Sequence, residues 1–169
     1  MDTTLTIGEY RFRPLVLSDI TSIVPIVNEY VATTTWAFSS VPREASHFER
    51  IFTAEPDAPR FIIEYNDAVI GFGYTHTYRE GATFSETTTF TYWLSPEHTR
   101  RGLGSMLYEL LETASKMNGK KHIIVSISSE NEASIAFHEK QGFSICGRFK
   151  EIGRKFDRSF DVVWMQKTL

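Results

Sequence analysis

Two arginines and two glycines stand together near the middle of the chain, in the segment Arg100-Arg101-Gly102-Leu103-Gly104-Ser105. Glycines allow a backbone to approach a ligand closely, and arginine side chains match the geometry of phosphate oxygens. The first amides of a helix have no partner within the helix and lie at the positive end of its dipole. If a helix begins at these glycines, the segment is typical of a turn that binds a phosphate group.

The flanking residues predict the strand and the helix that such a turn requires. Residues 86–94 are rich in Thr, Phe, Tyr and Trp, a composition typical of a β-strand. Residues 102–117 repeat apolar side chains at helical spacing, namely Leu103, Met106, Leu107, Leu110, Leu111 and Ala114. A Walker loop is excluded because Ser105-Met106 stands where that loop needs Lys-Ser or Lys-Thr. A dinucleotide fingerprint is excluded because Leu107 replaces its third glycine.

A second group of polar residues, Asn131, Ser134 and His138, has the spacing of one helix face. We expect the helix over residues 131–141, with Gly142 as its left-handed C-terminal residue. An unperturbed histidine titrates near neutral pH and can donate a proton. His138 is therefore a candidate for proton transfer. The alternative is a histidine that only interacts favourably with the C-terminal end of the helix dipole.

Both segments resemble signatures of one family, the Gcn5-related N-acetyltransferases, which bind acetyl-coenzyme A (acetyl-CoA). Residues 99–104, TRRGLG, resemble the pyrophosphate loop R/Q-x-x-G-x-G/A of that family at every position except the first. Residues 131–143, NEASIAFHEKQGF, resemble the second signature, N-x-x-S/A-x-x-φ-Y/H-E-K-x-G-F, where φ is apolar. Within the family the chain is most similar to the phosphinothricin and methionine-sulfone acetyltransferases, on the evidence of His138 and of residues 26–30, 33–38, 102–108 and 160–166.

The resemblance implies a binding site for acetyl-CoA. It places the pyrophosphate on the backbone amides of Arg100, Arg101, Gly102, Leu103, Gly104 and Ser105. It places the thioester beside Tyr92, Trp93 and Leu94, with an amide of Trp93 or Leu94 facing the thioester oxygen at a bulge in the strand. Asn131 and Ser134 then contact the pantetheine arm, and His138 protonates the leaving thiolate.

The acceptor side is predicted from the first half of the chain and from the start of the 86–94 strand. The subgroup has a glutamate at a strand position that Thr89 occupies here, and the nearest acid is Glu86, so Glu86 or Thr89 is expected to position a water that accepts the proton of the amine. The expected walls of the acceptor site are Tyr30, Trp36, Phe38, Tyr78 and Arg79. Arg79 is the candidate that binds a substrate carboxylate.

Composition limits the remaining possibilities. The chain has 169 residues, of which 41% are hydrophobic and 23% charged, as expected of one globular domain. Its net charge of −3 argues against a nucleic-acid-binding protein that depends on phosphate contacts. The single cysteine, Cys146, cannot form an internal disulfide, and no apolar run approaches the length of a membrane span, so we expect a cytoplasmic protein without membrane contact.

The order of the expected elements predicts an α/β (α+β) fold in a single domain over residues 1–169. Residues 5–15 are expected to be extended, with Gly8-Glu9 as a candidate hairpin turn within them. Further strands are expected over residues 60–65, 68–78, 84–94, 122–128, 144–150 and 160–166, and helices over 19–31, 43–52, 102–117 and 131–141. Ser18 is the expected N-cap of the first helix. The crossover from the 86–94 strand to the 122–128 strand makes this pair parallel. We therefore expect a mixed, bent sheet with helices on both faces and with these two strands splayed at one end.

The resulting prediction is an N-acetyltransferase that transfers an acetyl group from acetyl-CoA to the primary amine of a small amino-acid-like substrate, with CoA as the released product. One alternative acceptor is a protein N-terminus or a polyamine. Another alternative is a non-catalytic sensor of acyl-CoA, which the absence of an acid at Thr89 leaves open. The resemblance implies a homodimer, and nothing in the sequence predicts a metal site.

Overall fold

The computed structural model of the protein describes residues 4–169. Its four α-helices in these residues are α1 (Ile20–Thr33), α2 (Ala45–Ala54), α3 (Leu103–Met117) and α4 (Glu132–Lys140). The strands are β1 (Leu5–Ile7), β2 (Tyr10–Pro14), β3 (Arg60–Tyr65), β4 (Ala68–Thr77), β5 (Thr87–Leu94), β6 (His122–Ser128), β7 (Ser144–Lys155) and β8 (Arg158–Thr168).

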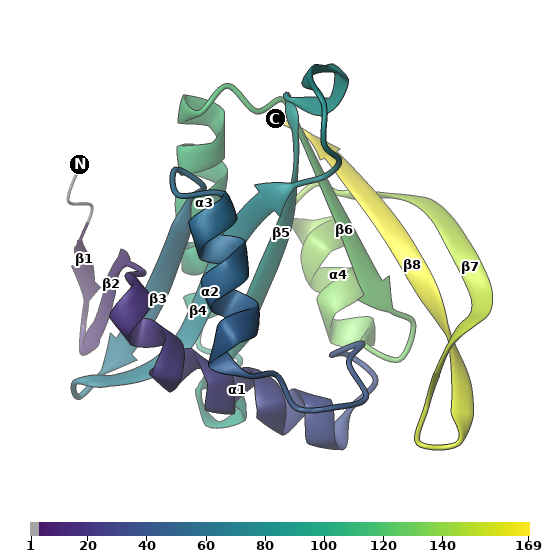
Figure 1. Ribbon diagram of the computed structural model, residues 1–169, viewed down its shortest axis with the longest axis horizontal. Coiled ribbons are helices and arrows are strands. Elements are labelled where there is room, and N and C mark those ends of the chain that lie inside the picture. The colour runs from purple at the N-terminus through teal and green to yellow at the C-terminus, as the bar shows by residue number, and fades with distance from the viewer. Residues whose placement is uncertain (1–3) are drawn as a thin grey trace.

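The eight strands form one mixed sheet in the order β1-β2-β3-β4-β5-β6-β8-β7 (Figure 1). Every neighbouring pair is antiparallel except β5 and β6, which are parallel as predicted. The turn at Asn66-Asp67 joins β3 to β4, and both residues have the positive φ angles, 50° and 60°, that a tight hairpin turn requires. The mixed sheet and the predicted fold class are therefore confirmed.

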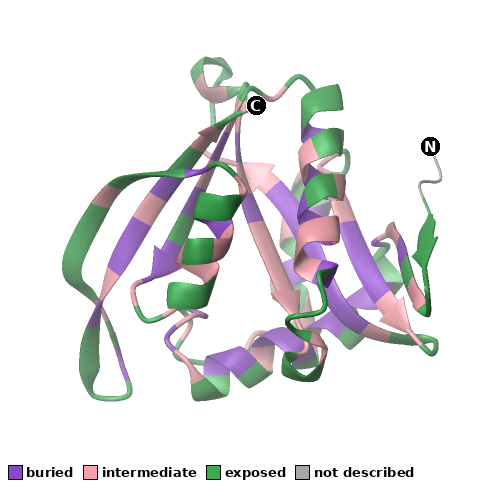
Figure 2. Ribbon diagram, turned by 180° about the vertical axis from the view of Figure 1, so that it is seen from behind, coloured by how far each residue is buried: buried purple, intermediate pink, exposed green. Residues whose placement is uncertain are grey.

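Helices cover both faces of the sheet (Figures 1 and 2). On one face α1 and α2 bury Ile23 and Phe48 against Phe72 of β4. On the other face α3 buries Leu107 and Leu111 against β3, β4 and β5. Gly73 of β4 allows α3 to lie this close, because a Cβ at position 73 would stand 2.9 Å from Cδ1 of Leu111.

Strands β5 and β6 separate after a short paired segment. Their parallel pairing extends only from Thr87 to Thr89 of β5, opposite His122 to Ile124 of β6. The two ribbons then diverge, and α4 is visible between them in Figure 1. Amides of a strand alternate between its two edges, so alternate amides of residues 90–94 face this gap rather than a partner strand. The predicted splay is confirmed, and it opens the sheet in its middle.

Two details of the expected elements are wrong. Ser18 does not cap the first helix, because a 3-10 turn over Leu17–Asp19 precedes α1. The last two strands are longer than predicted and form an extended hairpin that curves away from the sheet (Figure 1). The β7–β8 register shifts between Phe149 and Gly153, and Glu151 within this shift has a φ of 54°. Such an irregularity bends a hairpin, and it interrupts the alternation from which a strand is predicted.

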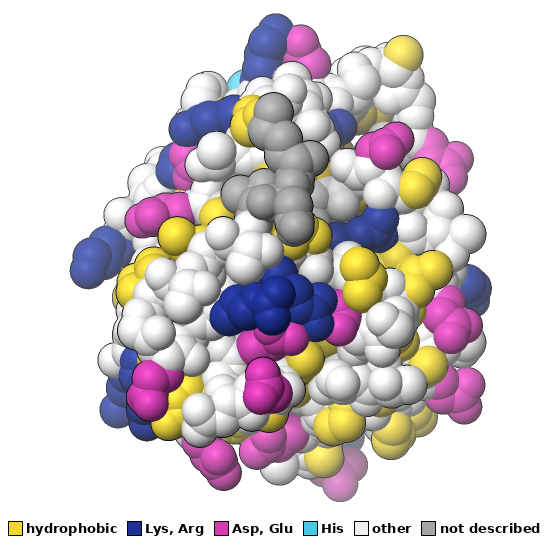
Figure 3. Space-filling view, turned by 90° about the vertical axis from the view of Figure 1, so that its left-hand side faces the viewer, with side chains coloured by type: hydrophobic (Ala, Val, Ile, Leu, Met, Phe, Trp, Pro, Cys, Tyr) yellow, Lys and Arg dark blue, Asp and Glu magenta, His cyan; other side chains and the backbone are white. Residues whose placement is uncertain are grey.

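Basic and acidic side chains are interspersed on the face of the molecule seen in Figure 3. A partly buried ion-pair cluster lies beside the first strands: Arg13 of β2 binds Asp19 at 2.8 Å and Glu64 of β3 at 2.7 Å. The two carboxylates raise the pKa of Arg13, and the guanidinium outweighs burial to lower the pKa of Asp19. This cluster joins the start of α1 to the sheet.

Candidate active site

A cavity of about 430 Å³ lies where β5 and β6 separate. It is lined by residues of α1 and the loop after it, of α2, of the end of β4 with β5, of β6 and β8, and of α4 with its N-cap. Its polar or aromatic lining residues include Trp36, Phe38, Arg43, His47, Tyr74, His76, Tyr78, Thr89, Thr91, Tyr92, Trp93, Ser126, Ser128, Asn131, Ser134, His138 and Trp164.

The cavity receives side chains from both faces of the sheet. Thr89 lies directly opposite His76 and Trp93 opposite Phe72, which places these residues on the α1–α2 face. Tyr92 points to the other face, where its ring lies 6.0 Å from that of Phe137 of α4. A ligand in the cavity can therefore be reached from either side of the sheet. This is the arrangement needed to bring two substrates together from opposite sides.

His138 is buried, with 3% of its surface exposed, and both ring nitrogens are hydrogen-bonded. Nδ1 lies 2.7 Å from the carbonyl oxygen of Ser134, which can only accept, so Nδ1 carries a proton. Nε2 contacts the hydroxyl of Tyr92. Burial lowers the pKa of His138 to about 4, so the ring is neutral at pH 7 and Nε2 accepts the proton of Tyr92. Burial also raises the pKa of Tyr92 well above its usual value.

In the free protein, this geometry argues against the predicted role of His138 as a proton donor. A proton donor for a thiolate must carry its mobile proton at neutral pH and point it toward the sulfur. The one proton of His138 is held by the Ser134 carbonyl inside α4, and Nε2 has none to give. His138 instead fixes the hydroxyl of Tyr92, which lines the cavity beside Asn131. The alternative, a histidine that only interacts with the helix dipole, also does not account for His138. The dipole favours a charged histidine at a helix C-terminus, and His138 is neutral.

His76 of β4 and Thr89 of β5 form a second hydrogen-bonded pair in the cavity. Nε2 of His76 lies 2.6 Å from Oγ1 of Thr89, and Nδ1 lies 3.3 Å from the carbonyl oxygen of Thr77. Burial lowers the pKa of His76, although the bond to Thr77 and the nearby carboxylate of Glu55 act in the opposite direction. Thr89 therefore has a neutral imidazole beside it, a neighbour that sequence reasoning did not identify.

The glycine turn has the conformation expected of an anion-binding turn. Gly102 immediately precedes α3 with a φ of 80°, and Arg100 has a φ of 61°. The amides of residues 100–104 have no acceptor among the described residues 4–169. Both arginine side chains are exposed; Arg101 contacts the hydroxyl of Tyr10 at 3.0 Å, which holds it near the turn. The turn is not part of the cavity lining, and it follows the C-terminal end of β5.

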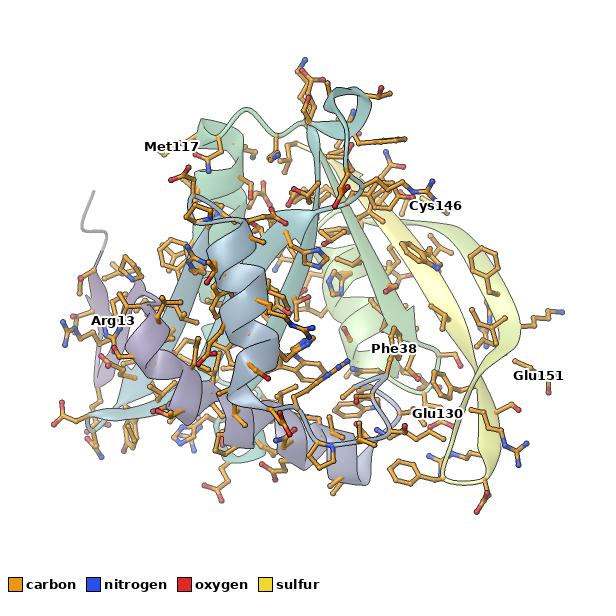
Figure 4. All side chains as sticks on the ribbon, in the orientation of Figure 1. Arg13, Phe38, Met117, Glu130, Cys146 and Glu151 are labelled. Carbon is orange, nitrogen blue, oxygen red and sulfur yellow. The ribbon has the colours of Figure 1, made fainter. Side chains whose placement is uncertain are left out.

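The loop after α1 forms the outer wall of the cavity, and the β7–β8 hairpin holds it in place. Nζ of Lys155 donates to the carbonyl oxygens of Thr34 at 2.7 Å and of Ala37 at 2.9 Å. Oγ1 of Thr35 donates to Glu130 at 2.7 Å, and Glu130 in turn binds Arg158. Phe38 and Glu130 are labelled at this junction in Figure 4.

Three of the residues predicted for catalysis or for the acceptor site lie outside the cavity lining. Tyr30 is buried beneath it, where its hydroxyl donates to the carbonyl of Leu94 at 2.6 Å. Arg79 is exposed and lies over the ring of Tyr78 at 5.5 Å. Glu86 precedes β5, is exposed, and pairs with Lys121 at 2.6 Å. Tyr30 therefore supports the site from below, and neither Arg79 nor Glu86 faces it.

The expected bulge near Trp93 is absent, because β4 and β5 pair without a register shift as far as Leu94. The site residues that sequence reasoning missed are Arg43, His47, Tyr74 and His76. Arg43 precedes α2 and His47 lies in it, and the sequence pattern of this helix is weak. Whether these two residues lie near β4 depends on how α2 packs on the sheet. A regular period-2 alternation from Phe72 through Tyr74 to His76 is the one signal that was available.

Two classes of site are not found in the part of the chain that is described. No group of three or more His, Cys, Asp or Glu side chains there is arranged to hold a metal ion. No helix over residues 4–169 is both long and apolar enough to cross a membrane.

A strand, a glycine turn and a helix beside a splayed parallel pair define a class of acyl-CoA-dependent transferases, and comparison with known proteins agrees. Residues 24–143 match the model of the acetyltransferase (GNAT) family, so the chain belongs to this family. It is 29% identical to a phosphinothricin N-acetyltransferase of Streptomyces coelicolor, over 96% of this chain and 98% of that one. It is 28% identical to an L-methionine sulfoximine/L-methionine sulfone acetyltransferase of Pseudomonas paraeruginosa, over 90% of this chain and 91% of that one.

A solved structure has the same fold. The phosphinothricin acetyltransferase of Sinorhizobium meliloti, in complex with acetyl-CoA, superimposes with a TM-score of 0.89 at 27% identity, over 95% of this chain and 89% of that one. The family assignment makes the protein an acetyltransferase that uses acetyl-CoA as its acetyl donor.

Proposed function

We propose that the protein acetylates the primary amine of a small amino-acid-like molecule, of the kind that the names of its relatives indicate, with acetyl-CoA as the second substrate. The observation that carries this proposal is the cavity between β5 and β6, which opens to both faces of the sheet. One side is walled by α4, and the other by α2 and the loop after α1.

The α3–α4 side suits acetyl-CoA. The free amides of residues 100–104 and the exposed arginines, Arg100 and Arg101, match a pyrophosphate. Asn131 and Ser134 line the cavity from α4, where they can contact a pantetheine chain. At the end of β5, the segment Tyr92, Trp93 and Leu94 has alternate strand amides that face the gap, and these can bind the thioester oxygen.

The opposite side suits an anionic, partly apolar amine. None of the described residues that line the cavity is an aspartate or a glutamate, which argues against a polyamine, a polycation that acidic side chains would have to bind. Arg43 lines this side, and no described residue pairs with its guanidinium. We assign to Arg43 the binding of a substrate carboxylate, the role that the sequence suggested for Arg79. Trp36, Phe38 and Tyr78 supply apolar contact.

Proton delivery to the thiolate does not need a charged histidine. The ammonium form of the acceptor releases two protons in forming an amide, and one of these balances the proton that the thiolate gains. The neutral His138–Tyr92 pair then contributes a fixed, polar wall beside the sulfur rather than a titrating acid. A protein N-terminus remains an alternative acceptor, because a free α-amino group resembles that of an amino acid.

Thiol release from acetyl-CoA with a panel of amines tests this proposal. We expect turnover with L-methionine sulfone and phosphinothricin, and much less with a polyamine or a peptide bearing a free N-terminus. Binding of acetyl-CoA without turnover of any amine would instead support the acyl-CoA sensor. Turnover led by the peptide or by the polyamine would contradict the proposed substrate class.

We further propose that the protein is a cytoplasmic homodimer. The support for a dimer is the outer strand β7, whose free edge carries the exposed apolar side chains Ile145, Phe149 and Ile152. The support for the cytoplasm is the single, exposed and unpaired Cys146. Light scattering on the purified protein should give twice the mass of one chain; the mass of one chain would contradict the dimer.

A further inference from the structure

His76 has the position and the protonation state of a base. It projects from β4 into the side of the cavity that we assign to the amine, opposite Thr89 in the antiparallel ladder. The carbonyl of Thr77 can only accept a hydrogen bond, so the neutral ring carries its proton on Nδ1. Nε2 is then the lone-pair nitrogen, and it accepts the hydroxyl proton of Thr89 at 2.6 Å.

Thr89 can release this nitrogen without losing its own hydrogen bond. Its hydroxyl has a second acceptor, the carbonyl oxygen of His76, at 3.3 Å. A side-chain rotation therefore frees Nε2 for an ammonium group that enters the cavity. The Thr89 hydroxyl therefore orients the imidazole in the free protein and rotates away from Nε2 when the substrate binds.

We propose that His76 is the general base that removes a proton from the acceptor ammonium, with Thr89 as its positioning residue; this inference rests on the proposed function. Arg43, on the same side of the cavity, is charged. His47 also lines this side, and burial with Arg43 and Arg50 lowers its pKa, but no hydrogen bond among the described residues orients its ring as Thr77 and Thr89 orient that of His76. The exposed Glu86 lies outside the cavity.

The proton inventory balances. The ammonium gives one proton to Nε2, and the free amine attacks the thioester carbon to form the C–N bond. The C–S bond then breaks, the nitrogen loses its second proton, and the thiolate sulfur gains one. His76 returns its proton to water, so the net reaction of ammonium and thioester yields amide, thiol and one proton.

The surroundings of His76 set the direction of its pH dependence. From α2 and the loop that follows, the carboxylate of Glu55 lies near, bound to the Thr77 amide at 3.0 Å. On β4 the ring of Tyr74 lies 6.0 Å away, and β5 contributes the uncharged Thr89. Arg43 and His47 face the same cavity. Burial outweighs Glu55, so the pKa of His76 lies below 6.5 and the base form prevails at neutral pH.

The test is the pH profile of kcat/KM for the amine, from about pH 5 to about pH 9, at saturating acetyl-CoA. We expect the natural protein to lose activity only below the lowered pKa of His76. His76→Gln should lower kcat/KM about 10²–10⁴-fold. Its remaining activity should rise tenfold per pH unit, because only the free-amine fraction of the substrate then reacts. Thr89→Val should still lose kcat/KM at low pH as the natural protein does, but with a lower kcat. His122 lies outside the cavity, so His122→Gln should match the natural protein.

A second readout does not depend on turnover. Nitrogen-15 NMR of the free protein should show His76 with its proton on Nδ1 at neutral pH and a pKa below 6.5. If kcat/KM of His76→Gln fell at low pH just as in the natural protein, the inference would be overturned. It would also be overturned if Thr89→Val no longer showed that fall. A natural protein that binds acetyl-CoA and acetylates no amine would contradict the proposed function instead, which keeps the two failures distinct.

Discussion

His138 and Tyr92 form a buried polar pair whose hydrogen bonds determine their states. The Ser134 carbonyl holds the proton of Nδ1, and Nε2 accepts the proton of the Tyr92 hydroxyl. A charged ring would donate from Nε2 instead, and the Tyr92 hydroxyl proton would then have no acceptor among the described residues. A buried group that is satisfied only in its neutral form resists protonation. The pair therefore links stability to pH.

Acidification should destabilise the protein through His138. The unfolded imidazole binds a proton near pH 6.5, and the folded one only near pH 4. Between these values the unfolded state binds more protons, so the free energy of unfolding falls as the pH decreases. The shift corresponds to about 3 kcal/mol at most. Urea denaturation at neutral pH and near pH 4 should show this loss in the natural protein.

His138→Gln is the matched variant for this measurement. A glutamine oxygen can still accept the Tyr92 hydroxyl, and it does not titrate. We expect the variant to lose about 3 kcal/mol less than the natural protein over the same pH interval. Equal losses in both proteins would mean that His138 is charged in the folded state or that its environment opens easily.

The β5–turn–α3 unit is the element that binds the charged end of acetyl-CoA in this account. Gly104→Asp should abolish the rise in melting temperature that acetyl-CoA gives to the natural protein, because it places a carboxylate where the pyrophosphate binds. The fold should persist, since a Cβ at position 104 meets only Cδ1 of Leu94 at 3.5 Å and an acid suits a helix N-terminus. Gly147→Asp on β7, with no atom near its added Cβ, is the control for charge. An undiminished shift in Gly104→Asp would place the cofactor elsewhere.

The β7–β8 hairpin is the element that holds the acceptor wall. Lys155→Met should raise KM for the amine and leave acetyl-CoA binding unchanged, because the carbonyls of Thr34 and Ala37 lose their shared donor and the loop after α1 loosens. The cost in stability should be about 1–3 kcal/mol. Steady-state kinetics and denaturation check both, with the exposed Lys150→Met on the same strand as control. An unchanged KM in Lys155→Met would separate the hairpin from the site.

At the scale of the whole molecule, the splay of one strand pair organises the site. Pairing of β5 with β6 stops at Thr89, and this single interruption opens a passage through an otherwise continuous sheet. Helices lie on both faces of this sheet (Figure 2). In the proposed function, backbone amides bind the donor on one side of the sheet and side chains bind the acceptor on the other.

The sequence predicted the acetyl-CoA side of the site, which depends on backbone groups, better than the acceptor side, which depends on side chains. Gly102 and the residues 131–143 lie on single elements whose local pattern is sufficient to locate them. The pairing of His76 with Thr89 depends instead on the strand register across the connection from Tyr78 to Glu86, where a 3-10 turn over Ala82–Phe84 replaces the expected start of the strand. The position of Arg43 likewise depends on Asn28, which binds its backbone amide at 2.7 Å. Such long-range contacts leave no periodic signal in the sequence.

The central claim, an acetyl acceptor bound through its carboxylate, is tested most directly by one matched pair of substrates. We would measure kcat/KM for L-methionine sulfone and for the amine that remains when its carboxylate is removed, in the natural protein and in Arg43→Met. A charge-assisted contact predicts a preference of about 10- to 100-fold for the amino acid in the natural protein. Arg43→Met should lose most of this preference while its turnover of the plain amine stays the same. Equal kcat/KM for the two substrates in the natural protein, or a preference that survives in Arg43→Met, would contradict the account.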